Sequence, residues 1–152
     1  MKKYRLTEET TKVGNRTLYR IQALRDFGNV TKGDIGGYIE SEKNLSQDGN
    51  AWVYGNARVY GDARVSGNAQ VSGDADIKTT GDICSMSGFG SEYRTTTAFR
   101  TKNGDVHVSC GCFFGSLEEF CQRVESTHGN NLYGREYKKM IEMLKIHFEV
   151  EP

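Results

Sequence analysis

Two short segments of this chain contain glycines and hydroxyl side chains, and the first also contains a cation, a composition that suits the binding of an anion. The first covers residues 88–97 (GFGSEYRTTT) and the second covers residues 110–116 (CGCFFGS). An arginine binds phosphate or carboxylate oxygens bidentately, and backbone N–H groups in tight turns bind the same oxygens. The residues predicted to bind such a ligand are Ser91, Arg94, Thr95, Thr96, Thr97, Cys110, Cys112, Ser116 and His128. The alternative is a glycine-rich linker followed by a threonine-rich strand.

The cysteines of the second segment raise the question of a metal. Cys110, Cys112, Cys121 and His128 are thiolate and imidazole donors, the kinds that zinc prefers. Structural zinc sites usually present paired cysteines at a longer spacing than C-x-C. We therefore expect no metal ligand and no cofactor, with the cysteines packed on one strand face and against a helix. A nucleophilic Cys–His pair is a further alternative, but no third residue that orients the histidine is evident.

These candidate residues lie on elements that the sequence predicts. Lys102-Asn103-Gly104-Asp105 contains an Asn-Gly pair, a strong signal for a β-hairpin turn. Ser116 and Glu119 form a capping box, which opens a helix. The expected elements are strands Thr95–Thr101 and Val106–Cys110, a helix from Ser116 to near His128-Gly129, and a second helix at about Gly134–Phe148. Residues 89–152 are thus predicted to form a ββαα unit.

The middle of the chain is an internal repeat with a period of six residues. From Val53 the sequence is VYGNAR, VYGDAR, VSGNAQ and VSGDAD. A leading valine favours an extended segment whose side chain enters a core, and Gly followed by Asn or Asp favours a bend. An amphipathic helix needs apolar residues at a spacing of about 3.6, which this period excludes. Weaker copies of the unit extend the repeat over residues 35–88.

This pattern resembles the hexapeptide-repeat family of left-handed parallel β-helices, in which three units form one triangular coil. The resemblance implies a mainly β fold, with a short β-helix of about three coils over residues 35–88. Stacked coils would align residues that lie 18 positions apart. The expected pairs are Ile35 with Val53, Val53 with Val71, Val59 with Ile77, Val65 with Ile83, Glu40 with Arg58, Arg58 with Asp76, and Arg64 with Asp82.

An open end of such a β-helix exposes strand edges and needs a cap. Two strand-like runs, Tyr4–Lys12 and Arg16–Leu24, flank Val13-Gly14-Asn15, which favours a hairpin turn. We therefore expect an N-terminal β-hairpin cap over residues 1–34. The predicted units are 1–34 for the cap, 35–88 for the β-helix and 89–152 for the C-terminal α+β unit.

The resemblance also implies self-association and suggests an activity. β-helices of this family commonly form trimers along flat faces, and the alternative is an ordinary solvated face. The predicted oligomer interface is Trp52, Tyr54, Arg58, Tyr60 and Arg64, all taken to face outward. Resembling enzymes transfer acyl groups with a histidine as the base. Residues 35–88 contain no histidine, which argues against an enzyme and leaves acyl transfer as an alternative.

The chain further resembles phage and prophage hexapeptide-repeat proteins of unassigned function, which are often labelled transferase-like on the repeat alone. The stretches that carry this resemblance are ALRDF…GDIGGYIE, the Gly-Asn/Asp-Ala repeats and TTTAFRTKNG…VSCGCFFGSLEEF…THG. The resemblance implies an accessory protein that acts in counter-defence. Such a protein would sequester a small anionic or nucleotide ligand, or block a host protein.

The composition bears on nucleic-acid binding, membrane insertion and the cellular compartment. Lys and Arg total 20, as do Asp and Glu, so the net charge is 0 and gives no strong nucleic-acid signal. No apolar run approaches the length of a membrane span, and four irregularly spaced cysteines fit a reducing compartment. We expect a cytoplasmic, non-enzymatic binding protein that forms a homo-oligomer, in the host cytoplasm if it is phage-encoded. A purely structural oligomer is the remaining alternative.

Overall fold

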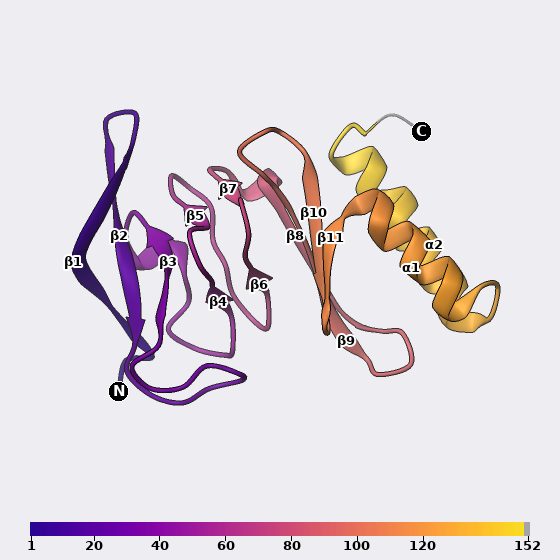
Figure 1. The fold of residues 1–152 in the computed structure, drawn as a ribbon, viewed down its shortest axis with the longest axis horizontal. Helices are drawn as coiled ribbons and strands as arrows, with labels where there is room; N and C mark the ends of the chain where they lie inside the picture. Colours follow the sequence, from indigo (N-terminus) through magenta and orange to yellow (C-terminus); the bar gives the residue numbers. More distant parts are fainter. Residues whose placement is uncertain (151–152) are drawn as a thin grey trace.

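The computed structural model describes residues 1–150 and arranges them in successive layers along the longest axis (Figure 1). An N-terminal hairpin lies at one end, the repeat follows, a four-stranded sheet comes next, and two helices cover that sheet. The strands are β1 (Tyr4–Val13), β2 (Arg16–Ala23), β3 (Ile35–Ile39), β4 (Trp52–Val53), β5 (Arg58–Val59), β6 (Gln70–Val71), β7 (Asp76–Ile77), β8 (Ile83–Phe89), β9 (Arg94–Arg100), β10 (Val106–Cys110) and β11 (Phe113–Ser116). The helices are α1 (Leu117–His128) and α2 (Leu132–His147), with 3-10 turns at Glu42–Asn44 and Thr80–Asp82.

The repeat places its leading residues in a shared core. β4 pairs in parallel with β6, so Val53 lies beside Val71, and β5 pairs in parallel with β7, so Val59 lies beside Ile77. These two predicted pairs are confirmed. The third-position glycines at 55, 61, 67 and 73 have φ between 59° and 64°, the left-handed conformation that glycine adopts at little cost. Each unit therefore combines a short strand with a glycine-dependent bend.

The predicted left-handed parallel β-helix of about three coils is nevertheless wrong. The five-stranded sheet β1-β2-β3-β5-β7 is mixed, because β1, β2 and β3 pair antiparallel before the parallel pairs begin. Each parallel pairing joins only two residues of each strand. Ile83 and the residues up to 89 form β8, which pairs antiparallel with β9. A period of six identifies the side chains that enter a core, but long-range partners set the direction of neighbouring strands.

The first part of the repeat is also out of the predicted register. Ile39 pairs with Val59 at a spacing of 20 residues, and Leu45 bridges Val65 at the same spacing. The cause is an irregular segment after Leu45 that is longer than one six-residue unit. Ile35, predicted to enter the core, is 53% exposed.

Only some of the predicted pairs of opposite charge form between neighbouring units of the repeat. Arg58 and Asp76 lie side by side, with the guanidinium 3.2 Å from the carboxylate, as predicted. Glu40 instead contacts Arg16 of the hairpin at 2.8 Å, because the register of the first units is shifted. The carboxylate of Asp82 accepts hydrogen bonds from two backbone N–H groups of the turn before it, which is a local cap and not a contact with the repeat below.

A four-stranded antiparallel sheet, ordered β11-β10-β9-β8, follows the repeat. Alternate residues of β9 enter different cores, since Phe99 belongs to the repeat core and Ala98 to the core beneath the helices. The predicted ββαα unit is therefore corrected to four strands and two helices. β8 was assigned to the repeat, and β11 was missed because only two residues, Gly111 and Cys112, separate it from β10.

Both predicted helices are present. The Ser116 hydroxyl accepts a hydrogen bond from Glu119 N at 3.1 Å, while Ser116 N donates to the Glu119 carboxylate at 2.9 Å, so the capping box opens α1. α2 begins two residues earlier than predicted, because the side chain of Asn131 caps it. The buried face of each helix packs on the sheet; these residues are Leu117, Phe120, Val124, Tyr137, Met140, Ile141 and Leu144.

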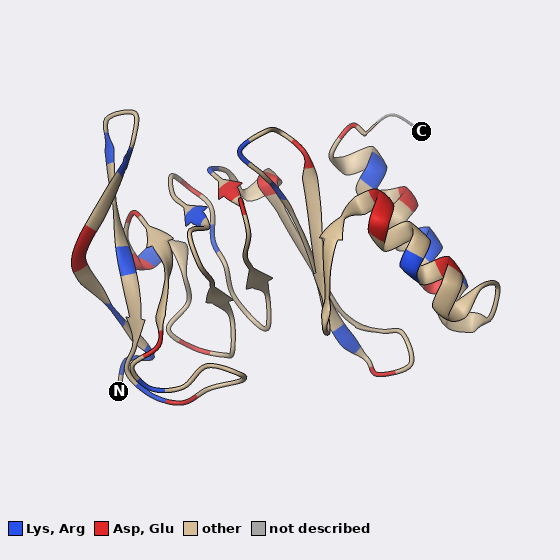
Figure 2. Ribbon diagram, in the orientation of Figure 1, with Lys and Arg blue, Asp and Glu red and all other residues tan. Residues whose placement is uncertain are grey.

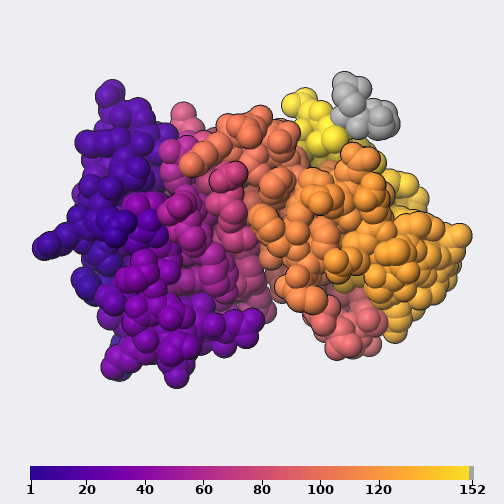
Figure 3. Space-filling model, in the orientation of Figure 1, coloured from indigo at the N-terminus to yellow at the C-terminus, as the bar shows by residue number. Residues whose placement is uncertain are grey.

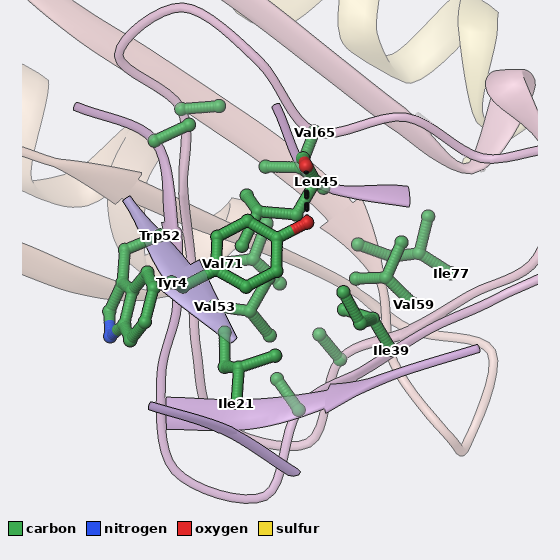
Figure 4. Packing of buried hydrophobic residues seen from close by; sticks show 14 of the residues in the cluster. Tyr4, Ile21, Ile39, Leu45, Trp52, Val53, Val59, Val65, Val71 and Ile77 are labelled. Atoms are coloured by element: carbon green, nitrogen blue, oxygen red, sulfur yellow. Dashed lines mark hydrogen bonds between the residues drawn. The ribbon is translucent and has the colours of Figure 1, made fainter. Parts of the chain in front are cut away.

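The N-terminal hairpin, which forms as predicted, closes the first end of the repeat core. The Tyr4 hydroxyl donates a hydrogen bond to the Leu45 carbonyl at 2.6 Å, and the rings of Tyr4 and Trp52 meet edge to face (Figure 4). The Lys3 ammonium lies in a cage of carbonyl oxygens, with Ala51 O at 2.8 Å. The Tyr4 hydroxyl and the Lys3 ammonium thus cover the N-terminal end of the apolar repeat core.

Charge is distributed without a dominant sign over the described residues. Figure 2 shows basic and acidic residues interspersed along both helices and over the N-terminal hairpin, with few in the strands between them. No helix within residues 1–150 is long and apolar enough to cross a membrane.

Candidate functional site

A pocket of about 100 Å³ lies where β9 begins, between the β10–β11 turn and the two helices. Its lining residues are Arg94, Cys110, Cys112, Phe113, Phe120, Arg123, Val124, Thr127, His128 and Tyr137. We refer to it as the arginine pocket. α1 supplies five of these residues from one face, and the β10–β11 turn supplies the opposite wall.

Two guanidinium groups and an imidazole line the arginine pocket. No ion pair within residues 1–150 involves Arg94 or Arg123. The Arg123 guanidinium lies 5.3 Å from the centre of the Phe113 ring, and the His128 ring stacks on Tyr137 at 5.9 Å. These aromatic contacts orient the Arg123 guanidinium and the His128 ring, and the guanidinium keeps its positive charge. The pocket therefore offers hydrogen-bond donors and positive charge to a ligand.

Two residues that line the arginine pocket, Cys110 and Tyr137, form a buried polar group with Thr96, which lies outside the lining. The Thr96 hydroxyl donates to the Cys110 Sγ at 3.3 Å, and the Tyr137 hydroxyl lies 3.7 Å from the same sulfur. Burial raises the pKa of Tyr137, and the contact with Cys110 raises it further. Tyr137 consequently stays protonated at neutral pH and acts as a neutral hydrogen-bond donor.

A second, wider hollow of about 490 Å³ lies between the repeat and the end of the four-stranded sheet at which β9 begins. Its lining residues are Gly28, Asn29, Asn50, Tyr54, Asn68, Gln70, Tyr93, Arg94, Thr95, Ser109 and Gly111. We refer to it as the amide cleft. In Figure 3 the surface is notched between the violet N-terminal atoms and the salmon atoms of the β8–β9 turn.

Arg94 lines both hollows and packs on the β10–β11 turn. Gly111 has φ of 59°, and a Cβ there would lie 2.7 Å from Cδ and Nη1 of Arg94. Gly111 lines the amide cleft, while its neighbours Cys110 and Cys112 line the arginine pocket. The turn and the Arg94 side chain together form the wall between the two hollows.

The structure brings together about half of the residues predicted to bind a ligand. Arg94, Cys110, Cys112 and His128 line the arginine pocket, and Thr95 lines the amide cleft. The remaining four line neither hollow. Thr96 and Thr97 are buried, Ser91 lies exposed in the β8–β9 turn, and Ser116 is the cap of α1.

Several lining residues were not predicted from the sequence. Arg123, Thr127 and Tyr137 of the arginine pocket lie on the two helices. Of the cleft amides, Asn50 and Asn68 lie in bends of the repeat, Gln70 lies in β6 and Asn29 lies in the loop after the N-terminal hairpin. Arg123 and Thr127 are four residues apart and share a helix face, but the predicted His128 is one residue from Thr127 and five from Arg123. The spacing therefore does not extend the prediction from His128 to Arg123 and Thr127.

The predicted outward face of the repeat differs from what the structure shows. Trp52 is 1% exposed and Tyr60 is 6% exposed, so neither side chain faces outward. Tyr54 and Arg58 are half-buried, and Arg64 is exposed. The side chains of Trp52 and Tyr60 were misplaced because aromatic residues after a bend pack against the N-terminal hairpin and loop, which the repeat pattern does not describe. The homo-oligomer itself stays a prediction.

The cysteines are all free thiols, and they pack only in part as expected, because Cys112 lies in the β10–β11 turn and not beside Cys110 on a strand face. Cys110 is buried, Cys84 and Cys121 are half-buried against the same core, and Cys112 is exposed. Within residues 1–150, no group of three or more His, Cys, Asp or Glu side chains is arranged to hold a metal ion.

No protein-family model matches this chain. Among curated proteins it is similar to the "Uncharacterized acetyltransferase YdcK" of Escherichia coli (strain K12), with 40% identity over 62 residues. The similarity covers 36% of this chain and 19% of that protein, so this chain matches only a small part of the length of its relative. The comparisons supply no link to phage or prophage proteins, to a trimer or to counter-defence.

Proposed function

We propose that this protein binds a small ligand through an anionic group that occupies the arginine pocket. The observation that carries the proposal is the convergence of Arg94, Arg123 and His128 on one pocket, with no ion pair to either guanidinium within residues 1–150. A volume of about 100 Å³ suits a phosphate or carboxylate group. The proposed function is binding rather than catalysis.

Titration with inorganic phosphate, followed by NMR of the ¹⁵N-labelled protein, tests the arginine pocket. We expect saturable shifts at the β10–β11 turn and along α1. Arg123→Met should weaken phosphate binding by about 10-fold or more, because a hydrogen bond to a charged group contributes about 1.5–3 kcal/mol. Arg135→Met is the matched control, since Arg135 is exposed on α2 and does not line the pocket.

If the Arg123 and Arg135 variants weaken phosphate binding equally, the binding depends only on net charge. Shifts that stay linear up to high phosphate concentration would show that no pocket is filled. Either result contradicts the proposal.

Similarity to a protein described as an uncharacterized acetyltransferase favours a second candidate, acyl transfer. His128 is the histidine that lines the arginine pocket, so it is the candidate base. Acyl transfer predicts saturable binding of acetyl-CoA and transfer of the acetyl group to an amine or alcohol acceptor. His128→Gln should then reduce the rate by about 100-fold or more while acetyl-CoA still binds. Absence of acetyl-CoA binding in calorimetry removes this candidate and leaves the binding proposal intact.

A further inference from the structure

The amide cleft is not used by the anion-binding proposal, and its chemistry differs from that of the arginine pocket. Arg94 is the only charged residue in its lining. The other polar side chains are the amides of Asn29, Asn50, Asn68 and Gln70 and the hydroxyls of Tyr54, Tyr93, Thr95 and Ser109. The asparagine amides each offer donors and an acceptor, and Gln70, whose amide nitrogen is bonded within the repeat, offers its oxygen as an acceptor, so the cleft matches a ligand surface that carries both donors and acceptors. A second charge on the ligand would be left without a partner there.

The backbone of the repeat holds these amides in place. Asn50 N donates to the Gly67 carbonyl at 3.0 Å, which stacks one bend on the next. The Gln70 amide nitrogen donates to the carbonyls of Asn50 and Asn68, each at 3.1 Å. The side chains of Asn50 and Asn68 therefore project from adjacent, mutually bonded bends. Because the backbone of these bends and the Gln70 side chain are already held, they lose little entropy when a ligand binds.

Tyr93 lines the same cleft and has an unusual backbone conformation. Its φ is 52°, in the left-handed region that residues other than glycine rarely adopt, and its side chain is 72% exposed. Tyr93 N donates to the Gly90 carbonyl at 3.3 Å, which holds the turn. The ring offers an apolar face beside polar amides, a combination that suits a ligand with both C–H and hydroxyl groups. Backbone strain of this kind is common where residues contact ligands.

We propose that the amide cleft binds the hydroxyl-rich part of the same ligand whose anionic group occupies the arginine pocket. The inference rests on the proposed function and specifies its ligand class as a sugar phosphate. Arg94 and the turn at Gly111 border both hollows, so one ligand that crosses this wall contacts both. A cleft of about 490 Å³ is wide enough for one sugar ring.

Titrations with glucose 6-phosphate, fructose 6-phosphate, ribose 5-phosphate, AMP and inorganic phosphate test the ligand class. We expect at least one sugar phosphate to bind about 10-fold or more tightly than phosphate, because the cleft adds hydrogen bonds. Asn68→Ala and Tyr93→Asn should each reduce this advantage and leave phosphate affinity unchanged. Asparagine tolerates a positive φ, so the second variant removes the ring and keeps the turn.

The outcomes separate the two proposals. If phosphate binds in an Arg123-dependent way but no sugar phosphate binds more tightly, the inference fails and the anion site stands. Tighter binding of AMP alone also overturns the sugar class. If a sugar phosphate binds with Asn68 dependence but without Arg123 dependence, the assignment of its phosphate to the arginine pocket fails.

A glycine pair provides a second, independent measurement. Gly111→Ala should weaken both phosphate and sugar phosphate binding by about 10-fold or more, because the added methyl displaces Arg94. Gly104→Ala is the matched control: Gly104 has φ of 83°, but no atom lies within 4 Å of its added Cβ. Both variants carry the same kind of backbone strain, and only the first disturbs the wall. Equal affinities in the two variants would contradict the role of that wall.

Discussion

Replacing Trp52 with alanine should lower the free energy of unfolding by about 3–5 kcal/mol. The indole is 1% exposed, and ring centroids lie 5.2 Å away for Phe27 and 6.2 Å away for Tyr4, both edge to face. Removing it leaves a cavity where the N-terminal hairpin and loop meet the repeat. Since a domain of this size is stable by about 5–15 kcal/mol, this is a large fraction of the total. Urea unfolding followed by circular dichroism measures it, because Trp52 is the only tryptophan and its fluorescence is lost.

Ile146→Ala is the control for this experiment. Ile146 is a large apolar residue on α2, but it is 80% exposed, so its replacement should change stability by less than about 0.5 kcal/mol. Equal effects of the two substitutions would show that Trp52 does not belong to the folded core. If Trp52→Ala is stable but changes self-association, Trp52 lies at an interface between copies of the chain.

The second large effect is a rise in stability with pH that originates at Lys3. This residue is fully buried, and its ammonium donates hydrogen bonds to the carbonyls of Ala51, Asp48 and Gly49 at 2.8, 3.3 and 3.4 Å. Burial is the main cause that lowers the pKa of Lys3 from 10.5 to about 8; the charge of Arg25 adds to the lowering and that of Asp48 opposes it.

The sign follows from proton linkage. Between pH 8 and pH 10.5 the unfolded chain keeps a proton that the folded Lys3 has lost, so the free energy of unfolding rises with pH. The gain is at most about 3 kcal/mol, is complete above pH 10.5 and is absent below pH 8. Burial raises the pKa of Tyr4 and Tyr60, which opposes the rise only above about pH 10, where unfolded tyrosines ionise. Urea unfolding at intervals from pH 7 to about pH 10 measures the slope.

Lys3→Met should abolish this slope whatever its effect on stability at pH 7. Lys2→Met serves as the control, because the Lys2 side chain is 60% exposed and pairs with Glu42 at the surface. A slope that persists in the Lys3 variant would assign the titration to another group.

Local features of the fold were predictable from the sequence, whereas the global arrangement was not. The capping box at Ser116 and the Asn-Gly turn at residues 103–104 depend on neighbouring residues, and both form as predicted. The valine pairs Val53–Val71 and Val59–Ile77 follow from the period of the repeat. Strand direction depends on partners distant in the sequence, such as β2 beside β3, and the period carries no information about them.

In the candidate site, too, some residues could be predicted from the sequence and others could not. Arg94 and the Cys-Gly-Cys turn were predicted from residue types, because glycine and arginine in short segments are informative by themselves. Arg123 and Tyr137 reach the pocket only because two helices pack on the sheet. Asn50 and Asn68 resemble the Asn and Asp residues of the other repeat bends, and only the three-dimensional structure shows that these two line the cleft with Tyr93.

Strand β9 contributes to two hydrophobic cores at once, with Phe99 on one side and Ala98 on the other. Repeat proteins usually lose structure unit by unit from an end, because each unit contacts only its neighbours. Here the last units of the repeat cannot open without uncovering Phe99, and the helices cannot leave without uncovering Ala98. Loss of β9 would therefore disrupt both cores together, so the molecule should melt in a single cooperative transition.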